Sequence, residues 1–182
     1  MALVRTGRGS YPSGTAHGTT PFSTGSFTPS DNSLLVVPVM HFLTFGGGTQ
    51  DPGQPTITDS SSGGPLSWTH RGRVFINTDA PFNLSIFTAP VTTGASMTIT
   101  VDDDDNDSVG SWNVHVVEFT GYDTDTPIGG FITSGNNTNI NDGAHTLTLT
   151  QAPTVDDQTL ACLALDVTSS PADATSATLT LL

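Results

Sequence analysis

The sequence predicts an all-β protein, an antiparallel β-sandwich or jelly roll. First, many short stretches alternate apolar and polar residues, which is the two-residue period of a pleated strand. Second, turn-forming Gly, Pro, Asn and Asp separate these stretches at intervals of roughly 8–15 residues, as in sandwiches and barrels. Third, the charged residues disfavour helices, because 16 of the 17 acidic residues are Asp and the chain contains no Lys.

Nine stretches of the chain fit strands well, and two shorter ones could add to them. In chain order, the expected strands cover residues 33–45, 55–59, 66–70, 74–77, 82–89, 97–101, 112–120, 131–133, 145–150, 160–167 and 177–182, of which 74–77 and 131–133 are the shorter ones. Near the C-terminus, alternating Thr and Leu indicate strands with Leu facing inward and Thr facing outward. No stretch has the apolar period of an amphipathic helix.

The stretch 33–45 reads SLLVVPVMHFLTF and is rich in β-branched and apolar residues, which favour strands. It is interrupted by Pro38, which has no backbone N–H and cannot donate a hydrogen bond to a neighbouring strand. The proline therefore predicts a bulge or an edge position for this strand.

The stretch 112–120 is expected to form a central strand. Trp112, Val116 and Glu118 fall on one face of the strand, and Phe119 falls on the other. Because large apolar residues occur on both faces, we expect the strand to be covered from both sides.

Glu118 is the only Glu of the chain and lies inside this apolar strand. We expect it to have a structural role, bonded to the backbone of a neighbouring loop or to Arg71 or Arg73. His115 lies three residues earlier and therefore on the opposite face, so the two side chains should not act together in catalysis.

Residues 1–30 are expected to form an extended N-terminal arm, and residues 31–182 a β-sandwich domain. The arm is rich in Gly, Ser, Thr and Pro and contains two of the four Arg residues. Such a segment is either a loose terminus or an arm that docks on a partner by strand addition or by inserting aromatic side chains. On the second interpretation, the residues that bind the partner are Arg5, Arg8, Tyr11, Phe22 and Phe27.

The formal net charge of −13 excludes several classes of partner. Nucleic-acid binding needs clustered Lys and Arg, which this chain lacks, and anionic membrane surfaces are disfavoured for the same reason. No stretch approaches the roughly 18 apolar residues of a membrane span. The remaining partners are basic surfaces, neutral surfaces such as glycans, and divalent cations.

The run DDDDND at residues 102–107 is the one candidate metal site. Asp103, Asp105 and Asp107 could supply the carboxylate oxygens that Ca²⁺ prefers. The spacing does not fit an EF-hand, because the loop lacks the required Gly and the final Glu. The alternative is a solvated turn between two strands, and in that case the protein needs no cofactor.

We find no set of residues that points to catalysis. The chain has no G-x-S-x-G nucleophile motif and no H-E-x-x-H zinc motif. A paired-carboxylate site would have to use Glu118 with Asp123 or Asp125, and Glu118 lies in an apolar run. Aromatic residues beside loops offer a different chemistry, since sugars stack on exposed rings, and Trp68 and Tyr122 are the candidates for glycan binding.

Several stretches together resemble β-sandwich proteins of tailed-phage virions. They are the Gly/Thr/Ser-rich arm, the strand SLLVV, the turn PTITD, the segment LSWT and the segment VVEFTGYDTDTPIG. The resemblance covers most of residues 30–182 in style, and such modules occur as capsid decoration, or cement, proteins and as accessory domains of tail and head fibres. Here the decoration type is expected. It implies a non-enzymatic structural protein at the capsid surface of the virion, which binds the major capsid protein or another virion protein and forms a homo-oligomer such as a trimer.

A second hypothesis comes from a different functional class. The chain could be a glycan-binding β-sandwich module of a fibre or of a secreted protein, with Ca²⁺ assisting the binding. This hypothesis requires an exposed aromatic platform at Trp68 or Tyr122.

Overall fold

A computed structural model describes residues 3–12, 21–43, 53–76, 82–103, 109–129 and 160. These residues form eight strands: β1 (Val4–Pro12), β2 (Phe22–Ser23), β3 (Ser33–Leu43), β4 (Thr56–Asp59), β5 (Thr69–Ile76), β6 (Phe82–Val91), β7 (Ile99–Asp102) and β8 (Val109–Thr120). Within these described ranges, no helix has the length and apolar character needed to cross a membrane.

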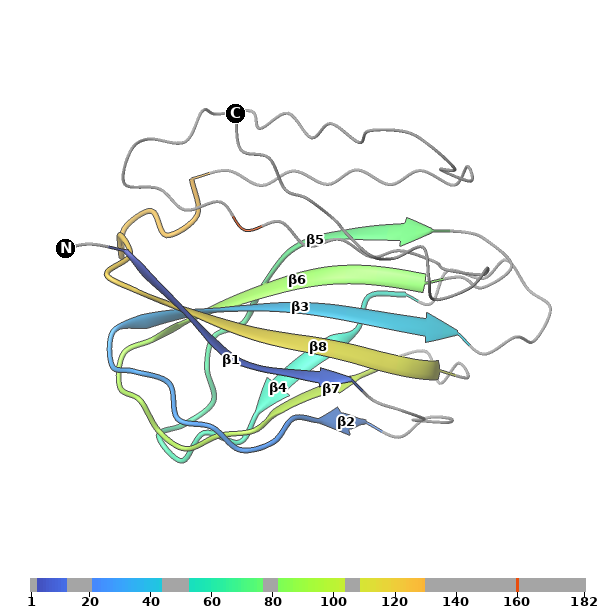
Figure 1. Ribbon diagram of the computed structural model, residues 1–182, viewed down its shortest axis with the longest axis horizontal. Coiled ribbons are helices and arrows are strands. Elements are labelled where there is room, and N and C mark those ends of the chain that lie inside the picture. Colours follow the sequence, from blue (N-terminus) through green and yellow to red (C-terminus); the bar gives the residue numbers. More distant parts are fainter. Residues whose placement is uncertain are drawn as a thin grey trace.

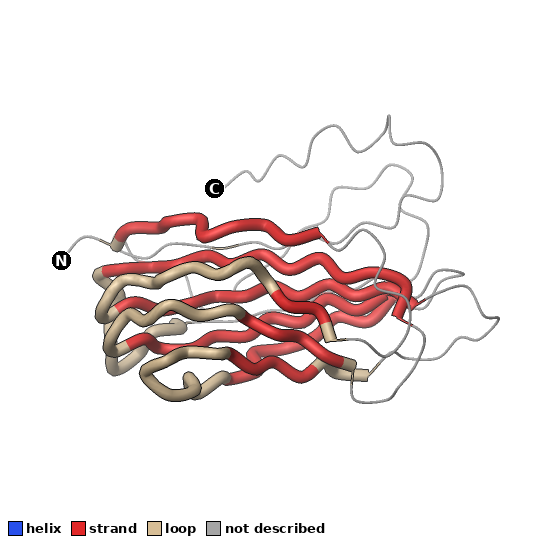
Figure 2. The backbone as a smooth tube through the Cα atoms, turned by 90° about the horizontal axis from the view of Figure 1, so that it is seen from below, coloured by secondary structure: helices blue, strands red, loops and turns tan. Residues whose placement is uncertain are grey.

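The strands form two antiparallel sheets, which confirms the predicted all-β sandwich. One sheet has five strands in the order β1-β8-β3-β6-β5, and the other has three in the order β2-β7-β4. Figures 1 and 2 show the small sheet packed along one face of the large one. The expected strands at 131–133, 145–150 and 177–182 and all of 160–167 except Leu160 lie outside the described residues.

The main core lies between the two sheets, because its members come from both. Alternate residues of each strand point inward, so one face of β3, β6 and β8 meets one face of β7. We call this set the inner core; it comprises Leu35, Val37, Val39, Phe87, Val91, Met97, Ile99, Val101, Trp112, Val114 and Val116.

A second, smaller cluster occupies the opposite face of the large sheet. Its buried members are Leu34, Val36, Val117 and Phe119, and we call it the outer cluster. Tyr122, Ile128 and Leu160 are among the partly buried residues that pack against it. The large sheet is therefore apolar on both faces over this region.

Strand β8 has the central position that its sequence predicts, since it lies between β1 and β3. Trp112 and Val116 are buried on its inner face, and Val117 and Phe119 are buried on the other. His115 shares a face with Val117 but is exposed. The predicted cover on both sides is thus observed at the end of β8 that leads to Thr120.

The prediction for Pro38 is wrong on both points. Strand β3 lies in the middle of the large sheet, between β8 and β6. Its ladder with β8 keeps one register from Val36 to Val39, so the chain does not bulge at the proline. The ladder instead pairs Val36 and Val39 with β8 and skips Val37 and Pro38. A central strand can accommodate this proline because the missing N–H costs only one ladder bond.

The N-terminal segment, expected to be an arm, contributes strands to both sheets. β1 pairs along its whole length with β8, from Val4 opposite Thr120 to Pro12 opposite Asn113. β2 pairs with β7, and Phe27 extends this contact through a bridge to Met97. The sequence did not indicate these strands because Gly and Ser interrupt their apolar pattern.

A tight contact between two loops leads to a first testable prediction. The N–H of Gly94 donates to Asp31 Oδ1 at 2.7 Å, and a Cβ at this position would overlap the backbone carbonyl of Pro29. We expect Gly94→Ala to destabilise the protein by about 1–3 kcal/mol, because backbone cannot move aside as cheaply as a flexible side chain. Urea unfolding measures the change.

Gly129→Ala is the matched control. Gly129 is exposed and a Cβ there would meet no atom within 4 Å. Its substitution should change the free energy of unfolding by less than about 0.5 kcal/mol. Equal effects of the two alanine variants would show that the loops do not make the close contact.

Candidate functional site

A buried ion pair with further hydrogen bonds lies where β1 pairs with the C-terminal end of β8. Glu118 is fully buried, and its carboxylate accepts hydrogen bonds from Arg8 Nε and, at 2.8 Å, from the backbone N–H of Ser30. Arg8 Nη2 also donates to Ser30 Oγ at 3.2 Å. The Glu118 carboxylate therefore links strand β1 and the loop before β3 to the central strand β8.

A β-bulge in β1 directs Arg8 to this position. Gly7 pairs with Val117 and Gly9 pairs with Val116, so Arg8 is the additional residue between them. Bulges commonly turn one side chain away from the regular alternation of a strand. Gly9 has a φ of 145°, a backbone conformation that residues with a side chain rarely adopt.

The structure partly confirms the expectation for Glu118. The predicted bond to the backbone of a neighbouring loop is present, with Ser30 as the donor. The cation is Arg8, however, and not Arg71 or Arg73. Arg71 instead donates to Thr88 Oγ1 at 2.8 Å on the neighbouring strand.

The bonds of Glu118 give stability a defined pH dependence. Burial alone would raise the pKa of Glu118, but the hydrogen bonds from Arg8 and Ser30 outweigh it and hold the pKa below its usual value. A carboxyl whose folded pKa is depressed stabilises the protein above its unfolded pKa of about 4.3, and this stabilisation is lost as the pH falls through the folded pKa. We expect the free energy of unfolding to decrease below about pH 4.3.

Urea unfolding between pH 6 and pH 3 tests this expectation on the wild type and on Glu118→Gln. The Gln variant should be less stable at pH 6 and should lose less stability on acidification, because it has no carboxyl to protonate at this position. The same pH slope in both proteins would contradict the assignment.

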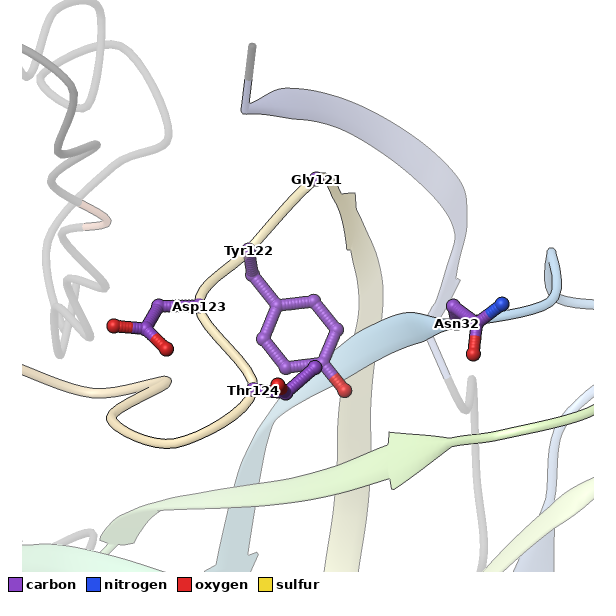
Figure 3. Close-up of a pocket in the computed structure, with 5 residues that line it drawn as sticks. All are labelled: Asn32, Gly121, Tyr122, Asp123 and Thr124. Atoms are coloured by element: carbon purple, nitrogen blue, oxygen red, sulfur yellow. The ribbon is translucent and has the colours of Figure 1, made fainter. Parts of the chain in front are cut away.

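Tyr122 follows β8 and lines a shallow cavity of about 420 Å³, together with Asn32, Gly121, Asp123 and Thr124. Figure 3 shows the Tyr122 ring between Asn32 and Asp123 in the view. Tyr122 is partly buried against the outer cluster, and burial raises the pKa of its phenol. A sugar ring could therefore stack only on the part of the Tyr122 ring that stays exposed in the cavity.

The loop of this cavity is held by its own polar groups. Asp123 Oδ2 accepts from Thr126 Oγ1 at 2.8 Å, and Asp123 Oδ1 accepts from the N–H of Asp125 at 2.9 Å. These bonds hold the pKa of Asp123 below its usual range. Gly121, with a φ of 76°, makes the turn from β8 into the loop, a conformation that glycine adopts without steric cost.

Trp68, the second residue predicted to bind a glycan, packs inward. Its ring is partly buried against the inner core, and its indole N–H donates to Asp59 Oδ2 at 2.9 Å. Asp59 also accepts from the N–H groups of Leu66 and Ser61, at 2.9 and 3.0 Å. Trp68 is therefore part of a fixed turn beside β4.

Of the residues predicted to bind a partner, Arg5 is exposed on β1 and Arg8 is paired with Glu118. Phe22 and Phe27 pack against the inner core of their own chain. Tyr11 lies on β1 opposite Val114, and its side chain lies outside the described residues.

The predicted metal ligands are only partly covered by the structure. Asp103 is buried just after β7, whereas Asp105 and Asp107 lie outside the described residues. Within the described ranges, no group of three or more His, Cys, Asp or Glu side chains is placed to hold a metal ion.

The described histidines have different surroundings and do not gather at one site. His41 is fully buried against the ring of Trp112, with 4.8 Å between the ring centroids. His70 packs against Phe87 at 5.1 Å, and burial lowers its pKa. His115 is exposed and Glu118 is buried, and the two lie on opposite faces of β8, as the alternation predicts.

Comparison with protein family models, with curated proteins and with solved structures gives no match for this chain.

Proposed function

We propose that the chain is a non-enzymatic structural protein of a phage virion, which binds the outer surface of the capsid and stabilises it. The proposal combines the resemblance of the sequence to decoration proteins with one structural observation, the open edge of β1. The partner is the major capsid protein or another virion protein, and the protein acts at the virion surface as a homo-oligomer.

Among the described residues, β1 forms one edge of the large sheet. It pairs with β8 on one side, and no other strand of the described residues pairs with it on the other. Val4, Arg5 and Thr6 are exposed, and Val4, at 51% exposure, is the one large hydrophobic residue exposed to this degree within the described ranges. An extended segment of a partner can add to such an edge through backbone hydrogen bonds.

The opposite edge of the large sheet is less suited to this role. Seven residues of β5 have a described exposure, and all of them except Thr69 are partly buried. Arg5 also gives β1 a positive charge in a chain whose net charge is −13. It can pair with an acidic residue of a partner strand, although an exposed pair adds less than about 1 kcal/mol.

The test is co-sedimentation of the full chain with emptied tailed-phage capsids from which the native decoration protein has been removed. The wild type should sediment with capsids of at least one phage in the panel. The double variant Val4→Lys with Arg5→Glu should bind at least 10-fold more weakly, because an edge Lys discourages strand addition and the Glu reverses the charge.

Thr58→Glu is the matched control, since it makes the net charge more negative by one, as the double variant does, on an exposed strand position of the other sheet. It should bind capsids like the wild type. No binding to any capsid, or equal binding by the β1 double variant, would overturn the proposal. Light scattering on the isolated protein tests the proposed oligomer.

The cavity at Tyr122 favours a second candidate function, a glycan-binding module. Its aromatic residue lies on a loop that hydrogen bonds keep in one conformation, which lowers the cost of binding. A glycan array probed with the wild type and with Tyr122→Ala tests this function. Binding that Tyr122→Ala abolishes supports it, and an array without signal removes it. A melting temperature that Ca²⁺ raises would indicate a calcium-assisted site.

A further inference from the structure

The outward face of the three-stranded sheet consists almost entirely of hydroxyl side chains. Alternate residues of β2, β4 and β7 point into the inner core, which turns the intervening positions toward solvent. We call this surface the hydroxyl face; its residues are Ser23, Ser26, Thr56, Thr58, Ser60, Ser96, Thr98 and Thr100, and all of them are exposed or half-buried.

Hydrogen bonds between neighbouring strands hold these hydroxyl groups in position. Ser23 Oγ and Thr100 Oγ1 lie 2.8 Å apart, and Ser60 Oγ and Thr98 Oγ1 lie 3.0 Å apart. A third pair, Ser26 Oγ and Ser96 Oγ, is also separated by 3.0 Å. Each hydroxyl has one donor and two acceptor positions, so every member of a pair keeps further capacity for a ligand.

The hydroxyl groups form a regular two-dimensional array. The register places Ser23, Thr100 and Thr58 in one row across all three strands. Rows repeat about every 6.6–6.8 Å along a strand, because every second residue faces the same way, and neighbouring strands are about 4.7–4.9 Å apart. A ligand that matches this surface must itself offer closely repeated hydrogen-bonding groups.

The charge and the composition of the hydroxyl face indicate which ligand it suits. None of its eight residues is charged, although the chain carries a net charge of −13. The outward positions of β7 also include Asp102, which lies opposite Thr56 at one end of the hydroxyl face. This negative charge disfavours an anionic ligand, and the uncharged array beside it suits a neutral one. A protein partner is disfavoured, because interface cores are enriched in aromatic residues, Met and Arg and depleted of Ser.

We propose that the hydroxyl face binds a neutral polysaccharide whose chains are extended and lie side by side. Sugar hydroxyls both donate and accept hydrogen bonds, as the Ser and Thr hydroxyls do. The regular sheet presents them at fixed intervals, which avoids the entropic cost of ordering separate side chains on binding. This site is distinct from the cavity at Tyr122 and from the open edge of β1, so it does not rest on the virion proposal.

The experiment measures retention of the full chain on microcrystalline cellulose, with amylose as a neutral polysaccharide of different chain shape and polygalacturonate as a charged one. We expect binding to cellulose to exceed binding to both others by at least fivefold. The double variant Thr98→Val with Thr100→Val should bind cellulose at least 10-fold more weakly, because it keeps the side-chain shape and removes two hydroxyls.

Three further variants keep the test decisive. Thr58→Glu places a charge on the hydroxyl face at an exposed residue that takes part in none of the three hydroxyl pairs, so it should fold and should also bind at least 10-fold more weakly. Thr6→Val, on exposed β1, and Tyr122→Ala should bind like the wild type.

Several results would overturn the proposal. They are the absence of cellulose binding by the wild type, unchanged binding by Thr58→Glu, or a loss of binding in Tyr122→Ala alone. If Thr58→Glu instead changes the oligomeric state in light scattering and leaves cellulose binding intact, the face contacts a second copy of the chain, which also contradicts the proposal.

Discussion

Arg8→Ala is expected to lower the free energy of unfolding by about 3 kcal/mol, because it leaves the buried carboxylate of Glu118 without its cation. The side chain of Glu118 is fully buried, whereas that of Arg8 is 29% exposed. Breaking a buried ion pair costs about 3–5 kcal/mol, and water that reaches the Arg8 site places the expected value at the lower end. Chemical denaturation at pH 7 measures the change.

Arg5→Ala is the matched control for Arg8→Ala. Arg5 lies on the same strand three residues earlier and is exposed, so its removal should change stability by less than about 0.5 kcal/mol. A double variant of Arg8→Ala with Glu118→Gln should recover part of the loss, since no charge is then left buried. Equal effects of Arg8→Ala and Arg5→Ala would contradict the structural role of the pair.

Trp112→Ala is expected to have the largest effect of any single substitution proposed, about 3–5 kcal/mol of destabilisation. Trp112 is 2% exposed, belongs to the inner core and contacts the ring of His41. Truncation removes the favourable burial of the indole and leaves a cavity that a β-sandwich can close only in part. The change is measured by thermal or chemical unfolding.

Trp112→Phe keeps an aromatic ring in the core and should cost less than the alanine variant. Trp68→Phe removes the bond to Asp59 from a ring that is only partly buried and serves as a second comparison. A stability loss below about 1 kcal/mol for Trp112→Ala would contradict its place in the core.

The fold class was predictable because alternation is a local property of the chain. The faces of β8 could be assigned from a few consecutive residues, and Trp112, Val116 and Glu118, which the alternation places on one face, are all buried. Burial of Glu118 followed from the same alternation. Its structural role could also be inferred, because a carboxylate inside an apolar strand requires bonding partners.

The partners of Glu118 could be predicted only in part, because they depend on contacts between distant parts of the chain. Arg8 precedes Glu118 by 110 residues, and the pairing of β1 with β8 brings the two together. One local signal was present, since Gly7 and Gly9 flank Arg8 and isolated glycines in a strand indicate a bulge. The composition of the segment favoured an arm, and this obscured the signal.

The hydroxyl face shows a different limit of sequence reasoning. Alternating Thr in 97–101 can indicate which residues face solvent, but it does not indicate which strands lie beside one another. Ser23 and Thr100 are 77 residues apart, and the pairing of β2 with β7 places their hydroxyls at 2.8 Å. The position of Pro38 in the sheet likewise could not be predicted, because the cost of its missing N–H depends on which neighbouring strand loses a hydrogen bond.

The pairing of β1 with β8 also sets the order of events during synthesis. Val4 can form its backbone hydrogen bonds in the sheet only after Thr120, its partner, has been synthesised. At roughly 5–20 residues per second, the ribosome needs about 6–23 s to make the intervening chain. Strand β1 thus leaves the ribosome before the other seven described strands and joins the large sheet only after β8, the last of them along the chain. Its edge is available to chaperones or to another nascent copy throughout that interval.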